Sequence, residues 1–247
     1  MYFEIPGTSI RVLGSLHMFP AGGAGMPPWV NEAYQWCESL VHEHELAAVL
    51  PYLKGDAPLQ QRLKPATWDA LIAALPSDQA RDAFSSFHPW AAMIALPSVF
   101  QATEPGVEQL LLARAAADGK PTAQLETGED LCRGFGAAPL ATVEDCIDQV
   151  LLDPGQMQPR LQAMYDAWTA RDRDALLAAA EASGAFSDPA LRDAGLLSRN
   201  RAWAPKVRRL MASSRRTLVV VGAMHLCGTG NLEECLGVGL VPVPVAA

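Results

Sequence analysis

The segment that most constrains the fold is Thr217 to Gly222, because its sequence TLVVVG places four large apolar residues in a row. A strand of this kind has to be covered on both faces, which is typical of a central strand in a parallel sheet. Other strand-like segments alternate with segments of helical periodicity along the 247 residues. We therefore expect an α/β fold in which helices flank a mixed, mostly parallel β-sheet, and we expect residues 1–247 to form one domain.

The expected sheet departs from the parallel arrangement at its ends. Four further segments have the composition of strands, the first of them a hairpin: residues 2–16, 39–45, 121–126 and 239–245. In the last segment, Pro242 and Pro244 lack amide donors on the same side of the backbone. We therefore expect the C-terminal strand to form an unpaired edge of the sheet.

Helical periodicity fills the segments between the expected strands. Frequent prolines in residues 57–104 predict several short helices, which we interpret as a helical cap or insert, and residues 139–197 predict a second helical segment. Pro105 is expected to begin a helix that Gly119 closes. Ser198 is expected to cap another helix near the C-terminal end of the chain.

The composition argues against a nucleic-acid partner and against a membrane span. The formal net charge is −8, which disfavours a polyanionic partner. The densest basic residues lie on an expected amphipathic helix and its exit, where a solvated face explains them: Lys206, Arg208, Arg209, Arg215 and Arg216. The N-terminal segment lacks the parts of a signal peptide, and no apolar run is long enough to cross a bilayer. We expect a cytoplasmic protein.

Five cysteines are scattered through the sequence without a C-x-x-C pair. Neither a disulfide framework nor a zinc–thiolate site is indicated, and reduced thiols agree with a cytoplasmic protein. Cys227 follows a motif histidine by two residues and could contact a metal, although a small buried core residue is the simpler interpretation.

Two strand-like segments end in the same motif, glycine followed three residues later by histidine. The first is Gly14 to His17, and the second is Gly222 to His225. In a largely parallel sheet both histidines would emerge at carboxyl ends of strands, where α/β proteins build their sites. The alternative is that backbone hydrogen bonds satisfy both histidines at the start of loops.

The expected strand at 39–45 ends in four polar residues, His42-Glu43-His44-Glu45. On a continuous strand, His42 and His44 would lie on one face and Glu43 and Glu45 on the other, so only one pair could face a given site. These residues form either an exposed polar strand end or a source of a carboxylate ligand or general base.

Two further segments carry candidate polar groups. Glu126 ends the expected strand before it, although Glu126 and Thr127 could equally cap the following helix. Arg199 and Asn200 could bind a substrate or orient a carboxylate, or they could be an ordinary surface or ion-pair segment.

The order of these motifs over about residues 9–243 resembles that of the TraB/GumN family, which includes the Tiki proteases. The matching segments are Gly14–His17, Leu40–Glu43, Leu125–Thr127, Arg199–Asn200 and Val221–His225. The resemblance implies a fold similar to the erythromycin-esterase and ChaN-like proteins, with helices capping a mixed sheet, and a divalent-metal requirement as in the Tiki branch. We expect the chain to depart from many relatives in having no leader or anchor, and its His-Glu-His-Glu strand end also differs from the family's pattern.

The expected function is therefore metal-assisted hydrolysis of an amide or related bond, with a peptide or a small molecule as substrate. His17 and His225 would bind the ion, and Glu43 would be a further ligand or the base for bound water. Glu126 would be an alternate ligand or would support the ligands, and Arg199 would steady a carboxylate or the developing oxyanion.

Mixed imidazole and carboxylate ligation suits Mn, Co or Zn as the divalent metal ion. A rival expectation is a binding protein without turnover, because ChaN-like relatives of the fold bind haem and a histidine can ligate iron as readily as zinc. The sequence predicts neither the substrate nor the oligomeric state.

Overall fold

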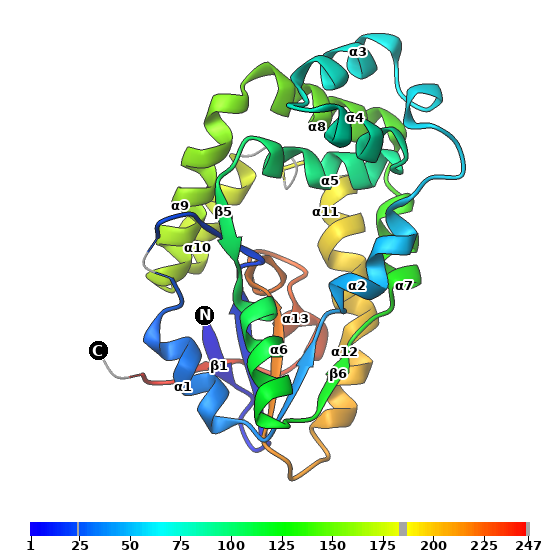
Figure 1. Cartoon of the computed structure of the whole chain (residues 1–247). Coiled ribbons are helices and arrows are strands. Elements are labelled where there is room, and N and C mark those ends of the chain that lie inside the picture. The colour runs from blue at the N-terminus through cyan, green and yellow to red at the C-terminus, as the bar shows by residue number, and fades with distance from the viewer. Residues whose placement is uncertain (24, 183–186, 246–247) are drawn as a thin grey trace.

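The computed structural model describes residues 1–23, 25–182 and 187–245, and its centre is a six-stranded mixed sheet with strand order β6-β4-β7-β2-β1-β8 (Figure 1). The strands are β1 (Tyr2–Glu4), β2 (Ile10–Ser15), β4 (Ser39–His42), β6 (Thr122–Gln124), β7 (Thr217–Gly222) and β8 (Val241–Pro242). β7 lies parallel between β2 and β4, and all of its residues are buried. The predicted central parallel strand and the predicted α/β fold class are confirmed.

The two ends of the sheet are built differently. β1 and β2 form the predicted hairpin, and β1 also pairs antiparallel with β8. β8 contains Pro242 and is an edge strand, as predicted. β6 is the other edge strand and pairs in parallel with β4. β4 and β6 are both shorter than predicted, since they end at His42 and Gln124.

β4 ends at His42 because a side chain takes the next position of the hydrogen-bond ladder. In the parallel register of β4 and β7, the Gly222 N–H would meet the carbonyl group of Glu43. The Glu43 carboxylate accepts that N–H instead, at 2.5 Å. The Glu43 carbonyl group accepts the Glu126 N–H at 2.9 Å. The prediction that this strand continues to Glu45 was therefore wrong.

Helices cover both faces of the sheet (Figure 1). The crossovers from β2 to β4 and from β4 to β6 run along the sheet in one direction, and the crossover from β6 to β7 runs in the opposite direction. Right-handed crossovers place α1 (Pro28–Trp36) and α6 (Val107–Asp118) on one face and α12 (Ser198–Leu210) on the other. A hydrogen bond of 2.6 Å from Tyr34 to Asp118 joins α1 to α6.

A second group of helices forms a cap at one end of the sheet (Figure 1). It consists of α3 (Pro65–Ala74), α4 (Asp78–Ser85), α5 (Pro89–Val99) and α8 (Leu140–Leu152). The apolar side chains of this cap form a cluster distinct from the one around the sheet. The predicted cap in residues 57–104 is confirmed.

The second predicted helical segment, residues 139–197, is also helical in its described part. After α8 it contains α9 (Met157–Thr169), α10 (Arg173–Glu181) and α11 (Pro189–Arg192). Residues 183–186 of this segment lie outside the described residues. Among the described residues, no helix is both long and apolar enough to cross a membrane. That the chain forms one domain stays a prediction.

The predicted helix start at Pro105 was wrong. Pro105 ends β5 (Thr103–Pro105), which pairs antiparallel with β3 (Met18–Pro20), a ribbon that the sequence did not indicate. α6 begins at Val107 after its N-cap residue Gly106. A Cβ atom at Gly106 would collide with the carbonyl oxygen of Leu16, so the chain can pass β2 closely only with glycine here.

The predicted N-cap at Ser198 was wrong too. α11 continues through a π-helical turn, Asp193–Leu197, directly into α12. The Ser198 N–H bonds to the carbonyl of Asp193, five residues earlier, and the Ser198 hydroxyl donates to the Ala194 carbonyl at 3.2 Å. Ser198 is therefore an internal helical residue, and Pro205 lies inside α12.

Candidate functional site

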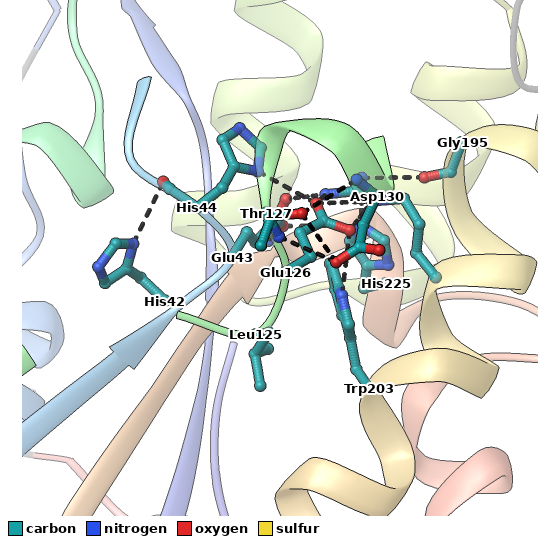
Figure 2. A network of polar contacts seen from close by, with 12 residues as sticks. His42, Glu43, His44, Leu125, Glu126, Thr127, Asp130, Gly195, Trp203 and His225 are labelled. Carbon is teal, nitrogen blue, oxygen red and sulfur yellow. Dashed lines mark hydrogen bonds and ion pairs between the residues drawn. The ribbon is translucent and has the colours of Figure 1, made fainter. Parts of the chain in front are cut away.

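The candidate residues gather at the carboxyl ends of four parallel strands. His17 follows β2, Glu43 follows β4, Glu126 follows β6, and His225 lies in a short 3₁₀-helix, Ala223–Leu226, directly after β7. Figure 2 shows Glu43, Glu126 and His225 close together, with His42 directed away from them. The expectation that the strand ends bring polar groups together therefore agrees with the structure.

Arg199 is the centre of this polar cluster. Its Nη2 donates to both Glu43 and Glu126 at 2.5 Å, and its Nε donates to Glu126 at 3.1 Å. Its Nη1 donates to the Gly195 carbonyl at 3.0 Å and to His225 Nε2 at 3.2 Å. Gly195 belongs to the π-helical turn, so this irregular turn supplies the carbonyl that holds the guanidinium in place.

The Arg199 ion pairs are almost fully shielded from water. The side chains of Arg199, Glu43 and Glu126 are 8, 3 and 4 % exposed. Burial alone would raise the pKa of Glu43, but the nearby positive charge of Arg199 outweighs it and holds that pKa well below its usual range. Trp203 Nε1 donates to Glu126 at 3.2 Å. Glu43 is therefore ionised, and both carboxylates accept hydrogen bonds at each of their oxygens.

His225 is held neutral in one tautomer. Burial lowers the pKa of His225 to about 3. Its Nδ1 lies 2.7 Å from the side-chain oxygen of Asn200, which can only accept, so Nδ1 carries the proton and Nε2 accepts from Arg199. The Trp203 ring packs against the imidazole with 4.4 Å between centroids.

His17 lies in a very different environment. Its side chain is 60 % exposed, and its Nδ1 lies 3.2 Å from the carboxylate of Glu108, in the first turn of α6. The charge of Glu108 raises the pKa of His17 to about 9, although the solvent around His17 weakens this attraction. The hydroxyl of Ser15 also lies within hydrogen-bond distance of Glu108 Oε1. Glu108 Oε2 is buried and has no hydrogen-bond partner among the described residues.

The glycine of the second motif leaves room for two of these groups. A Cβ atom at Gly222 would lie 3.0 Å from His17 Nε2 and 3.2 Å from Glu43 Oε1. Gly14 of the first motif has a packing role, since its Cβ would lie 3.0 Å from Leu226 and 3.2 Å from the Ala223 backbone. The glycine at 222 therefore allows His17 and Glu43 to meet over the end of β7.

Two groups of side chains in the described part of the chain could hold a metal ion, with donor atoms within 4.8 Å of one another. The first is His17, Glu43 and Glu108, and the second is Glu43, His44 and Glu126. Arg199 already bridges the two carboxylates of the second group. Neither group contains both motif histidines, although His225 Nε2 lies 3.6 Å from Glu43 Oε1.

The predicted alternation of His42, Glu43, His44 and Glu45 was wrong, because β4 ends at the first of them. Glu43 and His44 both reach the cluster, and His44 Nδ1 lies 3.1 Å from Glu126. His42 contacts the His44 carbonyl at 3.2 Å, and its Nε2 is buried without a partner among the described residues.

Glu108 was not predicted from the sequence. The only local signal for it is a carboxylate in the first turn of a helix, which is common for its favourable interaction with the helix dipole. Thr127 caps α7 (Gly128–Gly136) with Asp130, so Glu126 is not the cap. Cys227 is a buried residue whose thiol donates to the Ala223 carbonyl at 3.3 Å, as expected of a core cysteine.

The chain matches a known protein family. No curated protein matches the chain, and no solved structure does. The sequence pattern of the TraB/PrgY/gumN family matches residues 3–237. This match includes every residue of the cluster and, apart from Tyr2 of β1, every described strand except β8. The chain therefore belongs to the TraB/PrgY/gumN family.

Proposed function

We propose that the protein is a metal-dependent hydrolase that cleaves an amide bond and holds its divalent cation between His17, Glu43 and Glu108. The observation that carries this proposal is the meeting of these three donors at the strand ends. The buried Oε2 of Glu108 has no partner among the described residues, and a buried carboxylate oxygen without one is costly unless a ligand satisfies it. The residues therefore fit a cation.

The charges favour this group over the one with His44. In the second group, Arg199 already balances one of the two carboxylates and occupies the space between them. In the first group, Arg199 pairs with Glu43 alone, and the cation beside Glu108 is His17, which loses its charge when it ligates a metal. A divalent ion would therefore take the place of the His17 proton and supply the positive charge that Glu108 then lacks.

Glu108 has a second effect on His17. Its Oε1 accepts the Nδ1 proton of His17, which leaves Nε2 as the nitrogen able to ligate. When bound, a divalent ion supplies the Lewis acidity that makes water a nucleophile near neutral pH. The proposed identity of the ion is Mn, Co or Zn, because carboxylates and imidazole together suit these metals.

Arg199 acts on the carboxylates in this proposal and not on the substrate. A guanidinium has five N–H donors, and the contacts with Glu43, Glu126, Gly195 and His225 use all of its nitrogens. Arg199 therefore has no donor left for a developing oxyanion. Arg199 keeps Glu43 ionised and in position, which supports the expectation that Arg199 steadies a carboxylate.

The predicted ligation by His225 stays a prediction. Its Nε2 accepts from Arg199 and its side chain is only 2 % exposed, so it could reach an ion only if Arg199 moved. The same observation disfavours the haem-binding alternative, since a buried and engaged Nε2 is not available as an axial ligand. If the protein did bind haem, only the exposed His17 of the two motif histidines would be available as an axial ligand of the iron.

Metal binding tests the proposal directly. Calorimetric titration with Mn²⁺, Co²⁺ and Zn²⁺ should show one site, and His17→Ala and Glu108→Gln should each weaken it by about 10- to 100-fold. Glu129→Gln is the matched control, because that carboxylate is 67 % exposed on α7. Hydrolysis of peptides, followed by mass spectrometry, should require the ion and be lost in His17→Ala. Equal metal affinity in Glu108→Gln and Glu129→Gln would rule out this site.

A further inference from the structure

We infer that the substrate is an extended peptide that docks as an additional strand on the free edge of β6. The inference deepens the proposed function, on which it rests for the cleavage of the docked chain but not for its binding. β6 is the last strand on its side of the sheet, and no other described strand pairs with it there (Figure 1).

The backbone of β6 has hydrogen-bonding groups directed outward. Pro121 accepts from Leu40 at 3.0 Å and Leu125 donates to His42 at 2.8 Å, so both residues pair with β4. Alternate residues of a strand direct their N–H and C=O groups to opposite sides. Thr122 and Gln124 therefore direct theirs to the free edge, and all three residues of β6 are exposed.

A cavity lies along this edge and leads to the charged cluster. Its volume is about 300 Å³, and its lining includes the whole of β6 together with Glu126 and Lys206. A second cavity of about 700 Å³ also borders Glu126 and Lys206 and continues between α7 and α12, where Arg199 lines it. A peptide docked along β6 therefore reaches Glu126, the partner of Arg199, at the carboxyl end of the strand. The two cavities leave space on either side of Glu126.

The opposite edge of the sheet cannot receive a strand in this way. Val243 of the C-terminal segment donates its N–H inward to the Tyr2 carbonyl at 3.0 Å. The neighbouring outward positions are Pro242 and Pro244, which have no N–H to offer. Natural sheets block such edges with proline to prevent pairing with other chains. Of the two edges of the six-stranded sheet, the β6 edge, next to the candidate site, is therefore the one left open in the described part of the chain.

The recognised chemistry is the peptide backbone. The backbones of Thr122 and Gln124 can form hydrogen bonds with the alternating N–H and C=O groups of an extended peptide, whatever its side chains are. A compact small molecule would not present such a row of groups. The surface therefore favours an extended peptide over the small-molecule substrate that the sequence left open.

Two variants of Gln124 test the docking. Gln124→Pro removes one outward N–H and places a ring on the edge, but keeps the ladder to β4, because that N–H does not point toward β4. Gln124→Val keeps the N–H and is the matched control. The probe is a pool of fluorescein-labelled octapeptides blocked at both ends, with binding measured by fluorescence anisotropy. Gln124→Pro should weaken binding about tenfold, and Gln124→Val by less than about twofold.

A second measurement uses the unaltered protein. The same peptides with N-methylated backbones should bind at least about tenfold more weakly, because they cannot donate to the edge. Equal weakening in both Gln124 variants, or equal binding of both pools, would overturn the docking. Binding that depends on the Gln124 N–H without any metal-dependent cleavage would leave the docking and reject the hydrolase. Metal-dependent cleavage with the same kcat/KM in both Gln124 variants would reject the docking and leave the hydrolase.

Discussion

Replacing Arg199 by methionine should reveal how much the fold depends on one buried cation. The substitution keeps much of the volume of the side chain but removes the positive charge that contacts both Glu43 and Glu126. These two carboxylates, at 3 and 4 % exposure, would remain in the protein interior without their partner. A buried charge without a partner is among the costliest defects that a single substitution can create.

The distances set the size of the effect. At 2.5 Å between Arg199 Nη2 and each carboxylate oxygen, the Coulomb attraction is about 7 kcal/mol per pair at an effective dielectric constant of about 20. The desolvation of the three ions offsets most of this attraction in the native protein. Removal of one partner of a buried pair typically costs about 3 to 5 kcal/mol, and we expect a loss in that range at pH 7.

The loss should depend on pH in a defined direction. In the native protein the folded pKa of Glu43 lies below its unfolded value of about 4.3, so its stabilisation is present above that value and is lost as the pH falls through the folded pKa. Without Arg199, burial becomes the main influence and raises the pKa of Glu43 above about 4.3. The variant then loses stability as the pH rises, so its deficit should be larger at pH 7 than at pH 4.5.

Urea unfolding followed by tryptophan fluorescence, with a chelator present, measures this deficit at both pH values. Arg201→Met is the matched control on the same helix, because Arg201 and its partner Asp193 are 58 and 52 % exposed. The control should change the free energy of unfolding by less than about 0.5 kcal/mol. A loss in Arg199→Met below about 1 kcal/mol, or one that is equal at the two pH values, would refute the reasoning.

Three further predictions concern the two histidines. Glu108→Gln should return the pKa of His17 from about 9 toward about 6.5 in an NMR titration, and an unchanged titration would contradict this prediction. Since the folded pKa of His17 is raised, the stabilisation of the fold by the His17–Glu108 pair is present below about pH 6.5 and is lost as the pH rises through about 9. Gly222→Ala should weaken calorimetrically measured metal binding by more than about tenfold, because its Cβ would lie 3.0 Å from His17 Nε2, whereas Gly239→Ala, with nothing within 4 Å, should not. The pKa of His225, lowered to about 3 by burial, predicts a neutral ring with the proton on Nδ1 throughout pH 5 to 8, and ¹⁵N chemical shifts that titrate in this range would exclude it.

The sequence predicted what depends on local patterns. The run Thr217–Gly222 has to be buried on both faces, and β7 is indeed the strand between two parallel neighbours. Parallel topology then predicted that residues after the strands would meet, and Glu43, Glu126 and His225 do so around Arg199. These inferences needed only the order of the elements and the direction of the strands.

Glu108 could not be predicted in this way, because its position depends on a tertiary contact. The chain passes β2 so closely at Gly106 that no side chain fits there, and this approach brings the first turn of α6 to His17 and Ser15. An acidic residue in the first turn of a helix looks ordinary in a sequence. Only the folded chain distinguishes this carboxylate from one that merely favours the helix dipole.

The wrong predictions at His44 and Ser198 have a common physical cause. Each rested on a regular repeat, and in each case the backbone leaves that repeat near the site. The Glu43 carboxylate captures a ladder N–H and ends β4 early, and a π-helical turn replaces the expected helix start. Irregular backbone of this kind is common near functional sites, where a side chain has to be directed against the local period.

The two identical motifs place histidines in opposite electrostatic states. His17 meets solvent and the Glu108 carboxylate, so it gains a proton, whereas His225 is enclosed by Arg199, Asn200 and Trp203 and remains neutral. Metal binding at His17 must therefore release a proton, so its affinity should rise with pH up to about 9. His225 exchanges no proton in this range, so the motif alone does not make the two residues equivalent ligands.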